Sequence, residues 1–409
     1  MTQTTLFPAT RTAALERLSS FVPKAGRDYA SRRNYDLPTA NHPHVSQLSP
    51  YLRHRLLTEA EVVEAVLGRH SAATAEKFLQ EVFWRTYWKG WLQMRPQVWG
   101  AYRSGLDKAL AAIGRDNDLA NVVAKAEAGE TDIAAFNDWV EELVTTGYLH
   151  NHARMWFASI WTFTLRLPWE IGADFFLRHL LDGDPASNTL SWRWVAGLQT
   201  QGKHYLARSS NIAKYTEGRH NPEWRLNTQA APLKGPAHPA PRPAPTTQMP
   251  DQGLRTGILL TEEDLSPGFV LSRLETPPVG YAMMIGTGGG SPIRSAEHVY
   301  HFALAALEDT ASRWESRLGE GKGIGPTDDI EDIIDWALME RWEQVVTAYT
   351  PVGPTATLLA KLRKRLEDHG IRLVTVLRHW DEHAWPHATH GFFRFKSHIP
   401  DLIGDMSVE

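Results

Sequence analysis

One segment of the N-terminal half carries an acid, a base and two indoles at spacings that could form the wall of a ligand pocket. It reads Glu-Val-Phe-Trp-Arg-Thr-Tyr-Trp, and helical spacing places four of its residues on one face: Glu81, Trp84, Arg85 and Trp88. Charged groups are costly to bury without partners, so this face is poor core material. The pattern predicts either a pocket that combines hydrogen bonding with stacking, or a surface ion pair between Glu81 and Arg85.

Two further segments could hold a polar ligand, although each has a simpler alternative. Ser46-Gln-Leu-Ser49-Pro has the composition of a helix start, whose hydroxyls and free amides either cap the helix or bind a diphosphate. Asp182-Gly-Asp184-Pro is typical of a turn, in which the aspartates either cap the next helix, pair with Arg154 or accept hydrogen bonds from a ligand. Neither segment decides between its alternatives when it is taken alone.

A fourth segment, Thr-Gly-Tyr-Leu-His-Asn-His-Ala-Arg-Met, adds an amide and a guanidinium. Asn151, Arg154 and Met155 lie about one turn apart if the segment is helical. His150 and His152 are separated by two residues, and this spacing does not bring two side chains together on a helix. We therefore predict no metal site here.

The four segments together resemble the photolyase/cryptochrome family, in order and roughly in spacing. The resemblance also takes in Tyr29-x-x-x-Arg33-Asn34, the tryptophan of Pro168-Trp169, and an Asn-x-x-x-Trp-x-Trp run after the aspartate turn. Helix capping, a turn or a surface ion pair could explain each segment alone, but these do not explain why all the segments occur together in this order. The resemblance implies an all-helical domain that binds FAD, most of it within residues 20–228, and it leaves any antenna chromophore unknown.

The resemblance also implies which side chains hold FAD. Arg154 and Asp182 would pair beside the isoalloxazine, and Asn188 would face flavin N5, where its amide can tune the redox states. The residues expected around the phosphates and ribityl chain are Tyr29, Ser46, Leu48, Ser49, Glu81 and Arg85. Those expected around the rest of the bent cofactor are Tyr148, Asn151, Arg154, Asp182, Asp184 and Asn188.

Repair of DNA would depend on the pocket above the flavin. In members that act on cyclobutane pyrimidine dimers, a glutamate, two tryptophans and a methionine contact the flipped dimer, and the matching positions are Glu81, Trp84, Trp194 and Met155. Stacking of roughly 1–3 kcal/mol per base would make the tryptophans the main source of affinity, and Arg33 is expected to contact the DNA. Asn151 and Met155 stand where the (6-4) enzymes use histidines, which argues against (6-4) chemistry. The expected activity is light-driven dimer splitting, and the alternative is a cryptochrome-like photoreceptor without repair.

Two departures from the family pattern bear on this expectation. His152 replaces a basic residue, which would weaken a phosphate contact near neutral pH. Trp192 and Trp169 match the inner members of the electron-transfer tryptophan chain, but residues 114–129 contain no tryptophan for the outer position. The candidates to replace it are Trp156, Trp161 and Trp139.

The elements that must position these residues fall into two parts. Before residue 229 the apolar spacing is helical nearly throughout, as in residues 58–67, 73–93 and 132–143. Residues 229–253 are rich in proline and alanine, which favours an extended linker. After it, short apolar runs at 256–260, 280–285, 344–349 and 371–377 alternate with helical patterns at 295–318, 328–341 and 355–369. We expect a helical FAD domain at 1–228 and a Rossmann-like α/β domain at 254–409.

The order of the two parts differs from that of photolyases, in which an α/β domain comes first. The run from Thr256 to Leu265 resembles the opening strand of that domain, and Gly391-Phe-Phe-Arg-Phe-Lys resembles its end. This weaker match predicts a circular permutation. The glycines of residues 286–291 fit neither a P-loop nor a dinucleotide fingerprint, so a flexible loop is expected there.

Composition limits the remaining possibilities. The 409 residues include no cysteine, which excludes disulfides, thiolate metal sites and iron–sulfur clusters. Residues 1–228 contain 26 Lys and Arg against 23 Asp and Glu, whereas the rest contains 17 against 24, so damaged DNA would be bound by the N-terminal part. The beginning lacks a secretion pattern, and the most apolar run, residues 155–169, is short and contains Arg166. A cytoplasmic protein with no membrane partner is expected.

Overall fold

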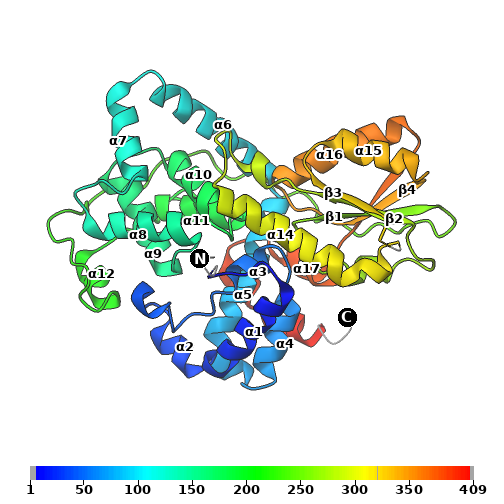
Figure 1. Ribbon diagram of the computed structural model, residues 1–409. Helices are drawn as coiled ribbons and strands as arrows, with labels where there is room; N and C mark the ends of the chain where they lie inside the picture. Colours follow the sequence, from blue (N-terminus) through cyan, green and yellow to red (C-terminus); the bar gives the residue numbers. More distant parts are fainter. Residues whose placement is uncertain (1–5, 320, 406–409) are drawn as a thin grey trace, which may run out of the picture.

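The computed structural model describes residues 6–319 and 321–405, which form a helical region and a region built on a parallel sheet (Figure 1). Among the described residues before 256, none belongs to a β-strand. This arrangement confirms the predicted fold class. The helices of the helical region are α1 Arg11–Phe21, α2 Arg27–Arg32, α3 Ser49–Arg53, α4 Glu59–Leu67, α5 Ala72–Gln93, α6 Pro96–Ile113, α7 Asn117–Glu127, α8 Ala134–Thr146, α9 Asn151–Ser159, α10 Trp169–His179, α11 Pro185–Ala196 and α12 Ser209–Tyr215.

Local chemistry explains where the helices that carry the candidate site begin and end. Thr58 and Glu61 form a reciprocal capping box at the start of α4, so two otherwise unpaired amides are satisfied. Asp184 caps α11 by accepting a hydrogen bond from the amide of Ser187, and Pro185 occupies the first helical position. The same helix ends at Gly197, whose φ of 85° is the left-handed conformation that favours glycine.

The α/β region contains five parallel strands in the order β3-β2-β1-β4-β5. Their bounds are β1 Thr256–Thr261, β2 Gly280–Met284, β3 Gly323–Thr327, β4 Gln344–Ala348 and β5 Arg372–Val376. The helices of this region are α13 Gly268–Leu271, α14 Glu297–Trp314, α15 Ile330–Met339 and α16 Pro354–Asp368. Alternate residues of β1 explain the layers: Leu260 packs in the cluster that contains α14, whereas Leu259 packs with α15 and α16 on the other face.

The edge strand β3 is the one strand that the sequence pattern does not predict. Its Gly-Ile-Gly-Pro-Thr sequence has no apolar run, and its residues are partly exposed. Gly323 is required there because a Cβ at this position would meet the ring of Tyr281 at 2.1 Å. The glycine-rich residues that follow β2 form a 3₁₀ turn at Thr287–Gly290.

The proline-rich segment between the two regions is bound to both of them. Among the described residues, none from 216 to 255 belongs to a helix or strand. The segment is nevertheless held by main-chain hydrogen bonds: Leu233 donates to Ala196, Arg242 to Met94, and Gln248 to Thr375. It therefore runs as an extended strap over the helical region and reaches the edge of the sheet beside β5.

The last three helices leave the sheet and return to the helical region. They are α17 His379–Ala384, α18 Phe392–Lys396 and α19 Ile399–Asp405. Trp380 stacks on Phe83 of α5 with ring centroids 5.0 Å apart, and a Cβ at Gly90 would meet the ring of Trp385 at 2.7 Å. Helix α5 is therefore buried between the N-terminal helices and the end of the chain.

Buried ion pairs join the helical region to the end of β1 and to α17. Arg53 forms two hydrogen bonds of 2.7 Å to Glu263, and Arg55 forms two of 2.7 Å to Asp381. Breaking a buried pair by removing one partner costs about 3–5 kcal/mol, since the other charge is then left uncompensated. These contacts fix the orientation of the sheet relative to the helices. No helix among the described residues is long and apolar enough to cross a membrane.

Candidate functional site

Arg154 and Asp182 form a bidentate ion pair at the centre of the helical region. Their two N–H···O hydrogen bonds measure 2.9 and 2.8 Å, and the Arg154 Nε also donates to the carbonyl of Leu149. Arg154 comes from α9 and Asp182 from the turn before α11, so the pair ties these elements together. The fork geometry of the guanidinium matches a carboxylate, which leaves its plane rigidly oriented. The structure thus brings together the two residues predicted to lie beside an isoalloxazine.

Glu81 is contributed by α5. Its side chain is accessible to solvent, yet burial raises the pKa of its carboxyl, an effect that the charges of Arg33 and Lys77 oppose. Tyr29 lies beside Glu81, and burial followed by the charge of that residue raises the pKa of the Tyr29 phenol well above its ordinary value.

Asp184 and Arg85 face the domain interface. Burial opposes ionisation of Asp184, but the charges of Lys89, Arg85 and Arg53 outweigh it and hold the pKa of the carboxyl well below its usual range. Lys89 lies 3.1 Å from Asp184, and Arg85 donates to Glu59 at 3.2 Å. The capping role and the charge network account for Asp184 and Arg85 in the structure, and contact with FAD stays a prediction for both.

The remaining predicted FAD contacts show different degrees of exposure. Asn151 at the start of α9 is exposed, and Met155 one turn later, which is a predicted dimer contact, is half-buried. Asn188 is buried and its amide Nδ2 donates to the carbonyl of Ala173 at 2.8 Å. The other predicted contacts comprise two half-buried serines and two buried apolar or aromatic residues: Ser46, Ser49, Leu48 and Tyr148.

The two tryptophans predicted to wedge a dimer both have aromatic neighbours. Trp84 stacks on Phe392 of α18 with ring centroids 3.6 Å apart and planes 11° apart. Trp194 is half-buried and stacks on Tyr205 at 6.0 Å. One face of Trp84 is therefore occupied by the end of the chain. Arg33, the predicted DNA contact, is half-buried and donates through its guanidinium to the carbonyl of Ala30.

The predicted electron-transfer residues lie in a buried aromatic core. Trp192 packs against α10 at Gly172, one turn from Trp169, and both indoles are buried. The rings of Trp169 and Tyr102 are 5.7 Å apart, and those of Tyr102 and the half-buried Trp99 are 5.2 Å apart. The three candidates for the outer position are fully buried, so none of them reaches the surface: Trp139, Trp156 and Trp161.

A hollow of about 250 Å³ lies on the outer side of Tyr29. Two cations, a histidine and one carboxylate line it, so its cations outnumber its acids and favour an anion such as a phosphate. Burial, followed by the nearby charges of Arg32 and Lys24, lowers the pKa of His44. The lining residues are Lys24, Asp28, Tyr29, Arg32, Pro43 and His44.

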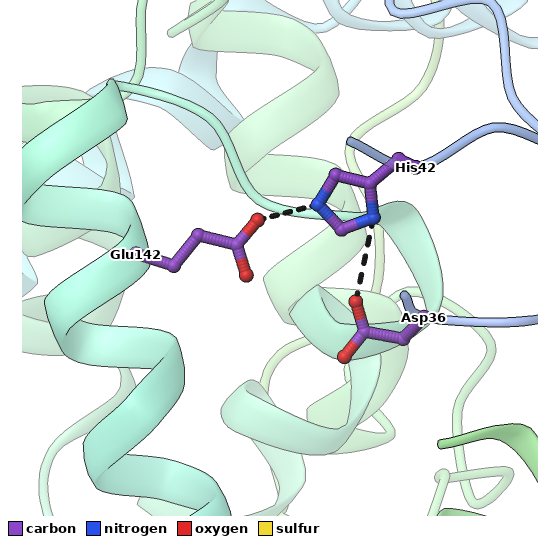
Figure 2. Close-up of side chains that lie close together, drawn as sticks. All are labelled: Asp36, His42 and Glu142. Atoms are coloured by element: carbon purple, nitrogen blue, oxygen red, sulfur yellow. Dashed lines mark hydrogen bonds and ion pairs between the residues drawn. The ribbon is translucent and has the colours of Figure 1, made fainter. Parts of the chain in front are cut away.

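The sequence pattern does not predict one cluster of chemistry-bearing side chains, which consists of Asp36, His42 and Glu142 (Figure 2). Asp36 and His42 lie in irregular backbone, where no helical or strand period relates them. Glu142 is contributed by α8, far along the chain. A contact between two loop residues and a distant helix leaves no spacing signal in the sequence.

Comparison with known proteins assigns the central part of this region. Residues 78–223 match the family model described as the FAD binding domain of DNA photolyase. This part of the chain is a photolyase-type FAD-binding domain. The FAD-binding domain includes α5 and continues through α12, so it contains Glu81, Arg154 and Asp182.

Curated relatives match the same half of the chain. The deoxyribodipyrimidine photo-lyase of Streptomyces griseus is 32% identical over 180 residues, which are 41% of this chain and 38% of that protein. The one of Thermus thermophilus is 34% identical over 187 residues, which are 46% and 43% of the two chains. The chain therefore spans about two fifths of the length of these relatives. A solved structure of a class III photolyase from Agrobacterium tumefaciens is 27% identical, covers 50% of this chain and 42% of its own, and gives a TM-score of 0.42.

The side chains of the FAD-binding domain fit the cofactor that its family implies. Glu81 presents an accessible carboxyl, and the Arg154–Asp182 pair presents a rigid, partly exposed guanidinium. The cationic hollow beside Tyr29 offers an environment for a phosphate. A polar cradle of this kind suits a cofactor that carries both a planar ring and a diphosphate.

Proposed function

We propose that the protein is a light-driven lyase that splits cyclobutane pyrimidine dimers in DNA by electron transfer from reduced FAD. The observation that carries the proposal is Glu81, an accessible carboxyl of the FAD-binding domain whose pKa is raised by burial. The names of the curated relatives support the same reaction class.

The task proposed for Glu81 is a hydrogen bond to the flipped dimer. Burial shifts its carboxyl towards the protonated form, and a protonated carboxyl can donate a hydrogen bond to a carbonyl oxygen. The carbonyls of a flipped pyrimidine dimer are suitable acceptors, and a damaged dimer costs less to extrude than an intact base pair. Met155 and Trp194 would supply apolar contact on the other sides of the dimer.

The other named residues would position the cofactor. When it is bound, reduced FAD supplies the electron that opens the cyclobutane ring after light absorption. Arg154 would be held in place by Asp182 and offer its positive charge to the flavin edge, with no reorganisation needed during the reaction. Asn188 would keep its amide orientation through the hydrogen bond to Ala173.

A second candidate function has one observation in its favour. Phe392 already stacks on Trp84, the residue that a photolyase would use as a wedge. A photoreceptor of the cryptochrome kind needs FAD but no open dimer pocket, so it would tolerate this contact. The contact is the reason to test repair directly.

The test is blue-light repair of UV-irradiated oligothymidine by the purified, reduced holoprotein, followed through the recovery of thymine absorbance. We expect light-dependent recovery in the wild type and its loss in Glu81→Ala, with bound flavin unchanged. Glu76→Ala is a matched control, because this acid lies on the same helix but is paired with Lys396 on the surface. No recovery by flavin-loaded wild type would favour the photoreceptor, and full repair by Glu81→Ala would refute the role of Glu81.

A further inference from the structure

Three polar side chains from separate segments meet in the interior of the helical region, as Figure 2 shows. Asp36 follows α2, His42 lies in the loop before α3, and Glu142 lies on α8. The side chain of Asp36 is fully buried, that of His42 is 3% exposed and that of Glu142 is 12% exposed. None of them has a part in the proposed repair reaction.

The hydrogen bond to Glu142 assigns the proton on His42. Its Nε2 lies 2.5 Å from Glu142 Oε1, so Nε2–H donates to the carboxylate. In the neutral ring, Nδ1 then carries the free lone pair. Nδ1 has no hydrogen-bond partner among the residues that the structure describes. A histidine that donates one N–H to a carboxylate and presents the other nitrogen is the usual arrangement of a metal ligand.

Asp36 presents a second free acceptor to the same point. Its Oδ2 accepts hydrogen bonds from Trp139 Nε1 at 2.9 Å and from Arg219 at 3.1 Å. Its Oδ1 has no hydrogen-bond partner within the described part of the chain, and it lies 3.6 Å from His42 Nδ1. That separation is too long for a hydrogen bond. Leaving buried acceptors unpaired costs about 1–3 kcal/mol each, so a positively charged group between them would be stabilising.

The separation suits a metal ion. Zinc bonds nitrogen and carboxylate oxygen at about 2.0–2.2 Å, and tetrahedral geometry then places two ligand atoms roughly 3.3 Å apart. The 3.6 Å between Nδ1 and Oδ1 is close to this value. We propose that Asp36 and His42 bind a divalent transition-metal cation of the zinc class, with Glu142 orienting the imidazole.

The site would fix a strained loop. Asn41, His42 and Gln47 have φ angles of 54°, 46° and 52°, a left-handed conformation that non-glycine residues adopt at a cost. A cation between Asp36 and His42 would hold this loop against the rest of the region. The loop leads directly into Ser46 and Ser49, so metal binding would anchor the segment predicted to contact the FAD phosphates.

The test measures zinc in the flavin-loaded protein after chelation and re-equilibration with Zn²⁺. Two other histidine pairs could add nonspecific binding: His379 with His383, whose rings are 3.7 Å apart, and His387 with His398, whose rings are 3.9 Å apart. Every variant therefore carries His383→Gln and His398→Gln. We expect about one zinc per chain in this background. Asp36→Asn and His42→Gln should abolish it, while His44→Gln in the same loop should not. Glu142→Gln should weaken binding by roughly 10–100-fold.

A second measurement does not depend on the variants being folded. The zinc X-ray absorption spectrum of the background protein should show one imidazole and oxygen ligands. Zinc content no higher than in a folded His42→Gln variant would overturn the proposal, and would leave the hydrogen bond between His42 and Glu142 as the explanation of the cluster. A spectrum without imidazole scattering would overturn it as well. Both readouts are independent of repair, so failure of the proposed function leaves this site standing.

Discussion

Two adjacent glutamates at the end of β1 should respond to pH in opposite ways. Glu262 and Glu263 are both fully buried at the interface between the regions. Burial, and then the charge of Glu263, raises the pKa of Glu262 to about 7 from an ordinary value of 4.5. Burial also acts on Glu263, but Arg53 outweighs it and lowers the pKa of Glu263 to about 2. Replacing each by glutamine therefore gives a matched pair of variants.

The sign follows from the direction of each shift. Glu262 keeps its proton in the folded state after the unfolded chain has lost it, so its contribution to stability is present below about pH 4.5 and is lost as pH rises to about 7. With about 1.4 kcal/mol per pKa unit, the loss above pH 7 amounts to ~3 kcal/mol. Near pH 5 it is under ~1 kcal/mol. Glu263 behaves oppositely, and its contribution is lost only as pH falls from about 4.5 towards 2.

Glu262→Gln removes the titration while keeping the shape of the protonated carboxyl. Its Oε1 accepts from the amide of Gly286 at 2.8 Å and from the Thr355 hydroxyl at 2.9 Å, which a glutamine oxygen can replace. We expect chemical denaturation to show a gain of ~2–3 kcal/mol in the free energy of unfolding near pH 9 and little change near pH 5. Glu263→Gln should lose stability at both. Equal effects of Glu262→Gln at the two pH values would refute the reasoning.

Two further changes test the packing around the site. Gly172→Ala should lower the free energy of unfolding by roughly 1–3 kcal/mol, because the new Cβ would meet the Trp192 ring at 2.4 Å; Gly100→Ala, with nothing within 4 Å, should be neutral or stabilising in the same denaturation assay. Phe392→Leu should free one face of Trp84 and tighten binding of UV-irradiated oligothymidine roughly tenfold, by the stacking of one base; unchanged affinity in a fluorescence titration would show that Phe392 does not compete with DNA.

Sequence periodicity predicted the elements that bury a regular face. The strands β1, β2, β4 and β5 follow from apolar runs, because each lies inside the sheet or is covered by helices. The edge strand β3 escaped prediction since its partly exposed residues carry no apolar pattern. The helix starts at Thr58 and Asp184 follow from capping chemistry that acts within a few residues. Secondary structure could therefore be predicted where an apolar period or a capping residue marks it within a few positions of the sequence.

Contacts between distant segments were predictable only through the family resemblance. Arg154 and Asp182 were expected to pair on that basis, and the structure brings them together. Arg53 and Glu263 are 210 residues apart, and no pattern in the sequence around either residue indicates that they pair. The stacking of Phe392 on Trp84 was equally invisible, because it depends on where the last helices return. The roles of the predicted site residues in binding FAD and DNA stay predictions.

The return of the last helices to α5 has a consequence for how the protein is made. The hydroxyl of Tyr87 on α5 donates to the carbonyl of His390, a residue 303 positions later. At about 5–20 residues per second, a ribosome needs roughly 15–60 s to synthesise that interval. Throughout it, the surface that Trp380, Trp385 and Phe395 will cover stays open to water. The nascent chain therefore exposes an aromatic patch for most of its synthesis, which makes it a natural client for chaperones that bind unfolded apolar surface.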